Sequence, residues 1–499
     1  MAEAVYSQLF HARGRMTRSA ALGIAAVVFV LAVGLALAAT LNIWQDEAYT
    51  LDTTAGGFAY ALNQAIHFEQ NAPLYFLVVT FLRKFGEDVF FLRAFSVVCA
   101  AATVALVPSL VRRYVPNADG GLVSAVVACN PFLIWSAVEM RAYALIVLIS
   151  ALLLLTFYDA FVKERASGWA AVAYAICVAL GLYTQYYLAF LIASQALAVA
   201  RWYRPRWLRY AAAVLAGVIA FAPMLSTIPA QVQNFREGFE APTIAHAVVT
   251  VASILWHYLV PLSFPGDELV YEVLTAALVL ALVHYRPVVT VAGGGAIAFV
   301  TVCAAVALAV ATYVAGIHVL NRHAASLYIP ATLSAFGIIA SLRGELRFRA
   351  AFVAGATAIV LSLASLGITY RALATPGDWI RVDAYLRSHE VPGQPIAVFE
   401  AENAVPLAYY YRGPNRVVPI PRGVDFQRYD VSNFVIRDES EILSVMPRTS
   451  RVWLITAGEC TSGNVRFGCS TLEHFVAGRY RVLSDVSFYG SRVRLLELH

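Results

Sequence analysis

Long apolar runs alternate with short basic clusters over the first three quarters of the chain. The first run covers residues 22–39, and similar runs follow it up to the start of a more polar tail. A membrane-spanning helix needs about 20 apolar residues, and cytoplasmic loops collect Lys and Arg. With every basic cluster in the cytoplasm, the pattern predicts about eleven transmembrane helices, a cytoplasmic N-terminus and a C-terminus outside. The clusters lie at residues 13–18, 112–113, 163–165, 201–209, 286 and 343–349.

Two stretches in the first external loop are apolar without being long enough to cross. Residues 72–85 form a run shorter than the roughly 20 residues of a span. Between residues 58 and 66 the apolar positions recur at helical spacing, as in an amphipathic surface helix. We therefore predict two helices that lie at the outer interface. The alternative is that residues 72–85 form a short tilted span.

After Pro376 charges become frequent and apolar runs shrink to strand length. We predict helices at 379–388 and 404–411, with strands at 396–399, 417–420, 452–456 and 493–498. Helices that alternate with short β-rich runs are typical of an α/β domain. The predicted organisation is thus a polytopic α-helical membrane domain at 1–375, followed by an external α/β domain at 376–499.

Composition supports the membrane assignment. The chain has 499 residues, of which 60% are hydrophobic and only 13% are charged, and its mean hydropathy is +0.68. A soluble domain carries about 25% charged residues. The run at 22–39 exceeds a signal-peptide core of about 7–15 residues, so we expect an uncleaved first helix. No block of Lys and Arg interleaved with aromatic residues suggests a nucleic-acid partner.

Motifs for nucleotide chemistry do not occur in the sequence. It contains neither a G-x-x-x-x-G-K-[ST] phosphate loop nor a G-x-G-x-x-G fingerprint. It also lacks an Asp-x-Asp pair of the kind that holds a nucleotide-sugar through a metal. These observations disfavour an ATP-driven pump and a nucleotide-sugar enzyme. With nucleotide donors disfavoured, we expect a sugar donor that the protein reaches from the membrane.

Polar residues gather at the predicted external ends of the spans. A carboxylate can take a proton from an acceptor hydroxyl, and the guanidinium fork of Arg suits a phosphate leaving group. The alternative is that each residue is an ordinary polar side chain at a span end. The candidates are Asp46, Glu47, Glu69, Asn71, Glu139, Arg141, Gln185, His318, Asn321, Arg322 and His323.

Several of these residues stand in segments that resemble a known family. The segment "WQDEAYT" at 44–50 resembles the first-loop Asp-Glu motif of GT-C glycosyltransferases, in the family 39-like branch that includes protein O-mannosyltransferases and lipid A aminoarabinose transferases. In chain order, the further similar segments are "NAPLYFLVVTFLRKFG", "NPFLIWSAVEMRAYAL", "GLYTQYYLAF", "VLNRHAASLYIPA" and "GDWIRVDAYLRS". Asn71 and Gln185 each replace a His of the family pattern.

The resemblance implies a GT-C fold and an inverting transfer of a sugar from a polyprenyl-phosphate donor, on the external (periplasmic) face of a bacterial inner membrane. By position, Asp46 would be the general base, and Glu47 would orient it or bind substrate. Arg322 would hold the donor phosphate. The other implied substrate-binding residues are Glu69, Asn71, Glu139, Arg141, Tyr143, Gln185 and His323. No cofactor is assigned, and a divalent metal is left open by the departures at Asn71 and Gln185.

Other functions and the acceptor remain open at this stage. The acceptor hydroxyl could belong to a glycan, a lipid or a protein. A transporter or flippase for a lipid-linked sugar shares the polytopic body, but it needs polar residues spread through the membrane. A non-catalytic subunit that presents the tail to a partner is a third alternative. In the external tail, Cys460 and Cys469 are predicted to form a disulfide.

Overall fold

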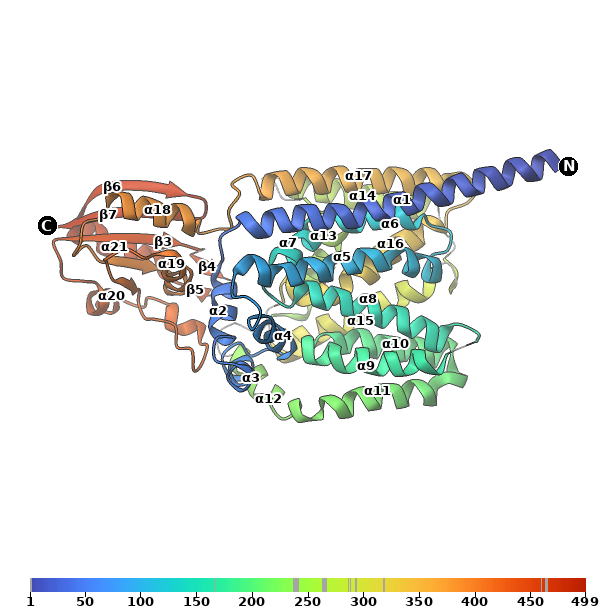
Figure 1. Cartoon of the computed structure of the whole chain (residues 1–499), viewed down its shortest axis with the longest axis horizontal. Coiled ribbons are helices and arrows are strands. Elements are labelled where there is room, and N and C mark those ends of the chain that lie inside the picture. Colours follow the sequence, from blue (N-terminus) through green and yellow to red (C-terminus); the bar gives the residue numbers. More distant parts are fainter. Residues whose placement is uncertain are drawn as a thin grey trace.

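The computed structural model describes residues 2–165, 167–236, 242–262, 267–285, 287, 289–291, 294–316, 319–458, 460–462 and 465–499. A bundle of helices forms the larger part of the molecule, and a domain built on a β-sheet sits at one end of it (Figure 1). We call this end of the bundle, formed by residues 41–88, 139–142 and 319–323, the capped end. The N-terminus lies at the opposite end of the bundle.

Among the described residues, seven helical segments are long and apolar enough to cross a membrane. They are Arg18–Thr40 in α1 (Ala2–Thr40), α5 (Val89–Tyr114), Tyr143–Val162 around α8 (Tyr143–Phe157), Arg204–Met224 around α11 (Trp207–Phe221), α15 (Gly295–Ala315), Asn321–Ala340 (the 3-10 helix η5, Asn321–Leu327, with α16, Tyr328–Ala340) and α17 (Leu346–Thr369). Shorter apolar helical segments accompany them: α9 (Gly168–Thr184), α10 (Leu188–Trp202), α13 (Ile244–Leu259) and Glu272–Tyr285 in α14 (Asp267–Tyr285).

A bent pair of helices adds an eighth candidate span. The helices α6 (Gly120–Cys129) and α7 (Pro131–Val138) meet at 59°. The bend lies at Asn130, whose side chain accepts a hydrogen bond from the Phe132 N–H at 2.9 Å and so begins a new helix. Pro131 has no N–H and suits the first helical position. The sequence predicts about eleven transmembrane helices. That number lies between these eight candidate spans and the larger number obtained when the shorter apolar helices are also counted.

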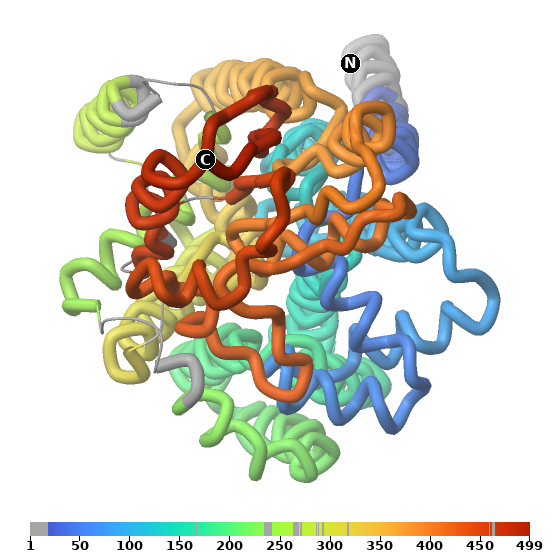
Figure 2. The backbone as a smooth tube through the Cα atoms, turned by 90° about the vertical axis from the view of Figure 1, so that its left-hand side faces the viewer, coloured from blue at the N-terminus to red at the C-terminus, as the bar shows by residue number. Residues whose placement is uncertain are grey.

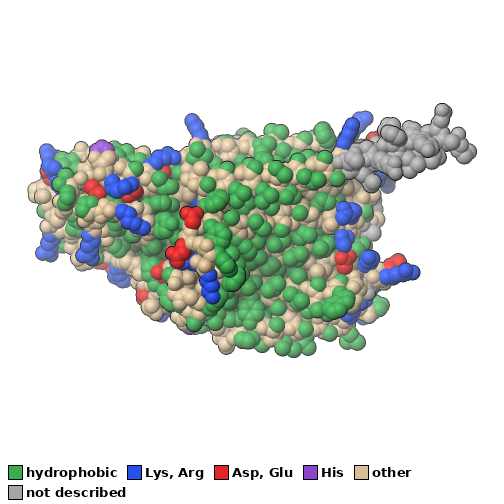
Figure 3. Space-filling model, viewed as in Figure 1, with side chains coloured by type: hydrophobic (Ala, Val, Ile, Leu, Met, Phe, Trp, Pro, Cys, Tyr) green, Lys and Arg blue, Asp and Glu red, His purple; other side chains and the backbone are tan. Residues whose placement is uncertain are grey.

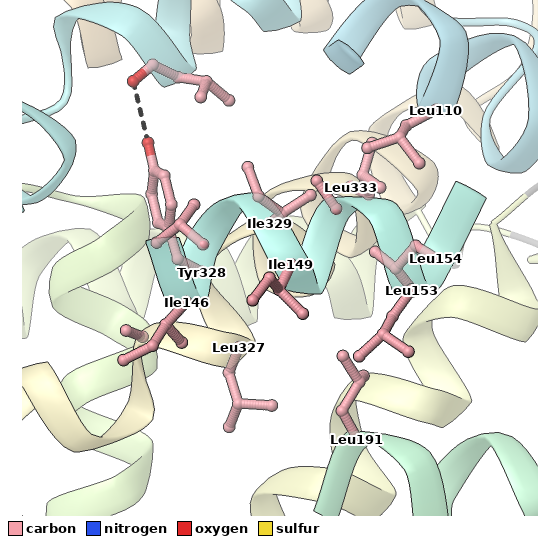
Figure 4. Close-up of a cluster of buried hydrophobic side chains, with 14 of the residues drawn as sticks. Leu110, Ile146, Ile149, Leu153, Leu154, Leu191, Leu327, Tyr328, Ile329 and Leu333 are labelled. Carbon is pink, nitrogen blue, oxygen red and sulfur yellow. Dashed lines mark hydrogen bonds between the residues drawn. The ribbon is translucent and has the colours of Figure 1, made fainter. Parts of the chain in front are cut away.

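The bundle has a well-packed apolar interior. Figure 4 shows α8 and α16 side by side, with Ile149, Leu153 and Leu154 among the buried side chains between the helices. The Tyr328 hydroxyl donates to the Val127 carbonyl oxygen at 3.1 Å, which ties α16 to α6. These buried side chains set the distance between the helices that carry functional candidates at the capped end.

The face of the bundle seen in Figure 3 is a broad apolar band between two charged ends. At the end away from the sheet domain, Arg113 pairs with Asp159 at 2.8 Å. Arg206 donates to the Phe161 carbonyl oxygen there at 2.8 Å. Arg113 and Arg206, which come from two of the basic clusters of the sequence, thus lie at that end, as expected for one face of a membrane.

Short helices cover the capped end. They are α2 (Gln45–Thr53), α3 (Phe58–His67), α4 (Leu74–Leu82) and α12 (Ile228–Arg236). The two helices predicted for the first external loop correspond to α3 and α4, and α4 is too short to be a candidate span. The rings of Phe58 on α3, Phe81 on α4 and Phe85 just after α4 are exposed. Lys84 lies 4.6 Å from the centre of the Phe58 ring.

The C-terminal domain is built on a five-stranded mixed sheet with strand order β2-β1-β3-β7-β6. The strand β1 pairs in parallel with β2 and β3, whereas β7 is antiparallel to β3 and β6. The strands are β1 (Ile396–Phe399), β2 (Val417–Pro419), β3 (Arg451–Ala457), β6 (Tyr480–Phe488) and β7 (Ser491–Leu498), and a small separate pair is β4 (Thr461–Ser462) with β5 (Val465–Arg466).

Alternate residues of the central strands face two apolar layers. Ile396 and Val398 pack with α18 (Trp379–His389) and α19 (Ala404–Tyr410). Ala397 and Phe399 face the other layer, which includes α20 (Glu439–Val445) and α21 (Cys469–Arg479). The predicted helices and strands of this domain are present. The sequence interpretation did not include β6, α20 and α21, and most of β6 is exposed or half-buried.

The predicted disulfide between Cys460 and Cys469 is confirmed, with a Cα–Cα distance of 5.7 Å. It joins the segment after β3 to the start of α21. Every other described Cys is free, and Cys99 and Cys177 are buried within the bundle.

The C-terminal domain covers the capped end of the bundle (Figure 2). The Tyr410 hydroxyl accepts a hydrogen bond from the Ile43 N–H at 2.8 Å. Thr375 hydrogen-bonds to Asn42 through both its backbone N–H and its hydroxyl, at 2.9 and 3.0 Å. The segment between α1 and α2 is therefore attached to the C-terminal domain through Tyr410 and to the linker before that domain through Thr375.

Candidate active site

The helix α2 begins at the candidate Asp-Glu motif. Trp44 is the residue before its first turn, and its N–H donates to Glu47 at 3.4 Å. Asp46 and Glu47 both lie in that first turn, where the unpaired N–H groups of a helix favour negative charge. Successive residues of an α-helix point about 100° apart, so these neighbouring carboxylates enter different surroundings.

Glu47 belongs to what we call the inner network, formed by Glu47 and Arg93. The carboxylate accepts from the Arg93 Nε and Nη2 at 2.7 and 2.5 Å. It also accepts from the Met140 N–H at 2.9 Å. Arg93 further donates to the carbonyl oxygens of Leu41 and Asn42, at 2.7 and 3.0 Å. The relative side-chain exposures of Arg93 and Glu47 are 1% and 0%, so this pair holds the chain together around α2 out of reach of solvent.

Asp46 belongs to what we call the outer network, formed by Asp46, Glu69, Arg141 and Arg322. Its Oδ2 lies 3.6 Å from the Arg322 Nη1 and 4.0 Å from the Arg141 Nε. These distances are longer than those of a charge-assisted hydrogen bond. The Asp46 and Arg322 side chains are 18% and 28% exposed. A loosely paired carboxylate and an accessible guanidinium therefore lie side by side.

Arg141 is fixed on its other side by Glu69. Its Nη1 donates to Glu69 at 2.8 Å and to the Thr50 hydroxyl at 3.1 Å. Its guanidinium also lies 5.5 Å from the centre of the Phe76 ring. Burial raises the pKa of Glu69, and the charge of Arg141 opposes that rise. The Glu69–Arg141 pair thus positions one cation beside Asp46.

Glu139 and Trp44 form a further support. The Trp44 indole N–H donates to the Glu139 carboxylate, and the Arg322 guanidinium lies 5.9 Å from the centre of the Trp44 ring. Burial and the nearby charge of Glu47 raise the pKa of Glu139 well above its ordinary value. Trp44 is therefore held between a buried carboxyl and the accessible arginine.

Three other candidates surround Arg322 without reaching Asp46 by a hydrogen bond. Gln185 donates to the Arg322 carbonyl oxygen at 3.5 Å. The His323 ring lies 5.7 Å from that of Tyr187, and its Nδ1 accepts from the Leu320 N–H at 3.1 Å. Tyr143 is buried and stacks on Trp135 at 4.9 Å between ring centres.

Two candidates lie apart from the cluster or outside the description. Asn71 is exposed, and its amide donates to the Glu69 carbonyl oxygen at 2.9 Å. It therefore supports the loop that carries Glu69 and does not contact Asp46, Arg141 or Arg322. His318 lies outside the described residues.

A carboxyl from the C-terminal domain joins the site and was not foreseen. Glu402 lies in the 3-10 helix η6 (Ala401–Asn403) and accepts from the Tyr49 hydroxyl of α2 at 2.6 Å. Burial raises the pKa of Glu402 to about 7, with the negative charge of Asp46 contributing. Arg93 was also overlooked, although a single Arg in an apolar run was a usable signal. The sequence carried no comparable signal for Glu402.

The described residues do not offer a metal site. Within them, no group of three or more His, Cys, Asp and Glu side chains is placed to hold a metal ion. The carboxylates around Asp46 already accept hydrogen bonds from Arg141, Trp44 or Tyr49, an arrangement unlike the oxygen cages of hard cations. A divalent metal does not fit this donor set, and we derive no step through one.

A family model described as dolichyl-phosphate-mannose-protein mannosyltransferase matches residues 70–228. No curated protein sequence matches the chain significantly. Among solved structures, ArnT from Cupriavidus metallidurans in the apo state is 11% identical with a TM-score of 0.57, over 96% of this chain and 98% of that chain. The same protein bound to undecaprenyl phosphate is 10% identical with a TM-score of 0.50, over 95% and 97%.

These matches extend over nearly the whole chain and include the C-terminal domain. At such low identity they establish the fold. The predicted GT-C fold is therefore confirmed, and the family model supports the resemblance of the sequence motifs over residues 70–228.

Proposed function

We propose that this GT-C membrane protein is a glycosyltransferase that moves a sugar from a polyprenyl-phosphate donor to an acceptor hydroxyl at the capped end. The observation that carries the proposal is the position of Asp46. It is accessible and only loosely paired, at 3.6 Å from Arg322, whereas the adjacent Glu47 is fully buried and hydrogen-bonded. A base must be able to reach the proton that it takes, and Asp46 satisfies that requirement.

The proposed step uses Asp46 and Arg322. Asp46 accepts the proton of the acceptor hydroxyl, and the hydroxyl oxygen attacks the anomeric carbon of the donor sugar. The bond from that carbon to the phosphate oxygen breaks, and its electron pair leaves with the polyprenyl phosphate. Attack opposite to the leaving group inverts the anomeric centre. Arg322 offers a charge-assisted contact to the departing anion, which grows stronger as negative charge develops.

Arg322 can exchange partners in this scheme. Its 3.6 Å contact with Asp46 is loose, so a lipid phosphate can replace the carboxylate with little loss. That exchange would release Asp46 from a cation and leave it available as a base. Glu47 acts in the scheme as a positioning residue through Arg93, since its oxygens are already used.

The donor class is supported by the comparison and by the membrane. One of the two similar ArnT structures has undecaprenyl phosphate bound. A lipid-anchored donor also fits an acid–arginine cluster at the end of an apolar bundle. We further propose that the capped end is external, with the C-terminal domain periplasmic, because basic residues gather at the opposite end.

The test is a reaction in nanodiscs with purified protein and a panel of undecaprenyl-phosphate sugars. Transfer should release free undecaprenyl phosphate and produce a glycoside of inverted configuration, read by mass spectrometry and NMR. Asp46→Asn is the inactive variant. Asp52→Asn is a matched control, because Asp52 lies on the same helix and its carboxylate accepts a hydrogen bond from the Tyr60 hydroxyl, at 3.4 Å. The control should retain transfer.

Translocation of the intact lipid-linked sugar without release of undecaprenyl phosphate would instead establish a flippase. Reporter fusions address the orientation. Fusions after Arg113, Arg209 and Arg349 should report cytoplasm, and one at His499 should report the outside. A cytoplasmic signal at His499 would contradict the proposed topology.

A further inference from the structure

Glu402 is held rigidly by its own domain. It lies in the turn that follows β1 and is only 5% exposed. The next residue, Asn403, donates from its side chain to the Ala457 carbonyl oxygen at the end of β3, at 3.1 Å. The carboxyl is thus presented by the centre of the sheet and not by a loose loop.

Two tyrosines from different parts of the chain donate to the same Glu402 oxygen. The Tyr49 hydroxyl lies 2.6 Å from Oε1, and the Tyr429 hydroxyl lies 3.2 Å from it. Tyr49 follows Asp46 by three residues, and residues at that spacing share one face of a helix. The contact from Glu402 therefore reaches α2 on the side that carries Asp46.

Aromatic packing restricts Tyr49 from the remaining directions. Its ring makes edge contacts with Phe68 at 5.2 Å and with Phe426 and Tyr429 at 6.2 Å between centres. The Gln70 amide donates to the Tyr429 carbonyl oxygen at 3.3 Å. The segment around residues 426–429 is consequently attached to the bundle on one side and to Glu402 on the other.

We propose that Glu402 of the C-terminal domain is a positioning residue of the transfer site, which acts through Tyr49 to hold α2 and thereby Asp46 in place. The proposal rests on the proposed function. It makes the C-terminal domain a structural part of the site, since the bundle alone leaves the outward face of Tyr49 without its acceptor. For this role the residue at position 402 must supply an oxygen that accepts hydrogen bonds from both tyrosine hydroxyls. Glu402 takes no part in proton transfer.

Variants at Glu402 separate this role from plain stability. Glu402→Leu removes the acceptor, and we expect kcat to fall about ten- to a hundredfold through misplacement of the base. Binding of undecaprenyl phosphate should change little. Glu402→Gln keeps an oxygen acceptor and should restore most of kcat.

The matched control is Glu390→Leu. Glu390 accepts a hydrogen bond from the Tyr411 hydroxyl in the same domain, and its other side-chain partner, Asn415, also belongs to that domain. This control breaks a comparable Tyr–Glu contact without touching α2, so its kcat should stay within about twofold of wild type.

Hydrogen exchange provides a readout that does not depend on activity. Amides of Gln45–Thr53 should exchange faster in Glu402→Leu than in wild type or in Glu390→Leu. If wild type shows no transfer but α2 responds in this way, the proposed reaction fails while the positioning contact stands. Unchanged α2 exchange, or equal kcat in Glu402→Leu and Glu390→Leu, would overturn the positioning role. A Glu402→Gln protein as impaired as Glu402→Leu would overturn it too, because the carboxylate itself would then be required.

Discussion

The inner and outer networks place adjacent residues of one helix turn in opposite situations. In the inner network, Glu47 and Arg93 share short hydrogen bonds, and both are buried. In the outer network, Asp46 faces Arg322 and Arg141 at 3.6 and 4.0 Å and keeps part of its surface exposed. Residue type alone does not separate Asp46 from Glu47. Burial and contact distance do, and they are the basis for proposing a structural role for Glu47 and a chemical role for Asp46.

The comparison also explains why the two networks lie together. A buried ion pair needs excellent geometry to offset the loss of hydration, and the carbonyl oxygens of Leu41 and Asn42 complete that geometry around Arg93. Once the inner network fixes the first turn of α2, the outer network can stay loosely paired without losing its position. Pre-organised charge of this kind is what stabilises a developing anion.

The largest effect is expected from breaking the inner network. Arg93→Leu leaves the Glu47 charge buried and unpaired, so we expect a loss of about 3–5 kcal/mol in the free energy of unfolding. Thermal unfolding in detergent measures it. The double variant Glu47→Leu with Arg93→Leu should recover much of the loss. If Arg93→Leu is as stable as wild type, the Glu47–Arg93 pair does not have this structural role.

Parallel exchanges at the neighbouring carboxylates sharpen the contrast. Asp46→Asn should lower kcat by about two orders of magnitude, or about 2.7 kcal/mol, with an unchanged melting temperature. Glu47→Gln should lower the melting temperature and reduce kcat less. Transfer kinetics and thermal unfolding on the same preparations give both values. The reverse order of kcat losses would exchange the two assignments.

A change remote from both networks should alter stability without altering transfer. Cys460→Ser with Cys469→Ser opens a loop with a sequence separation of 9, which should destabilise the C-terminal domain by about 2–3 kcal/mol. Limited proteolysis of the tail would report the loss. Equal protease resistance with and without the disulfide would contradict this expectation.

The donor contact of the outer network should respond in a graded manner. Arg322→Lys keeps the charge and loses the planar fork, and Arg322→Ala loses both. We expect the affinity for undecaprenyl phosphate in nanodiscs to fall by about threefold and about tenfold respectively. Arg83→Ala is a control at the same end, since Arg83 contacts the Leu51 carbonyl oxygen and Glu87. If a folded Arg322→Ala protein keeps its affinity for undecaprenyl phosphate, Arg322 does not bind the donor phosphate and Arg141 becomes the candidate.

The smallest effect concerns the titration of Glu402. Burial raises its pKa from 4.5 to about 7, so the folded chain binds this proton more tightly than the unfolded chain. The resulting stabilisation is fully present below pH 4.5 and is lost as the pH rises through about 7. Glu402→Gln cannot titrate, so its melting temperature relative to wild type should rise between about pH 5 and about pH 8. A constant difference would show that Glu402 does not titrate in this range.

Local sequence patterns predicted the parts of the fold that depend on local physics. Apolar length predicted most spans and excluded residues 72–85 from crossing. Short continuous apolar runs predicted β1 and β3, because both faces of these strands are covered. The strand β6 was not predicted because most of its side chains are exposed or half-buried, which leaves no apolar pattern.

The site was predictable only where a motif carried it. Asp46, Arg141 and Arg322 were named from their positions, and the structure brings them together. Their pairings were not predictable, since Glu47 and Arg93 are distant in sequence and meet only after folding. Glu402 belongs to another domain and reaches Tyr49 across hundreds of residues. Such a contact leaves no trace in local composition.

The exposed aromatic rings on α3 and α4 have a consequence for how reactants arrive. The rings of Phe58, Phe81 and Phe85 are exposed, and α3 and α4 lie near α2 at the capped end (Figure 1). Phe is common on the membrane-facing side of helices that lie in the interface. These rings would hold Asp46 near the depth of the lipid phosphates. The lipid-linked donor would then reach the site by two-dimensional diffusion in the membrane, whereas a water-soluble acceptor would reach it by three-dimensional diffusion in solution. Encounter with the donor would depend on its density in the leaflet, and encounter with the acceptor on its concentration in solution.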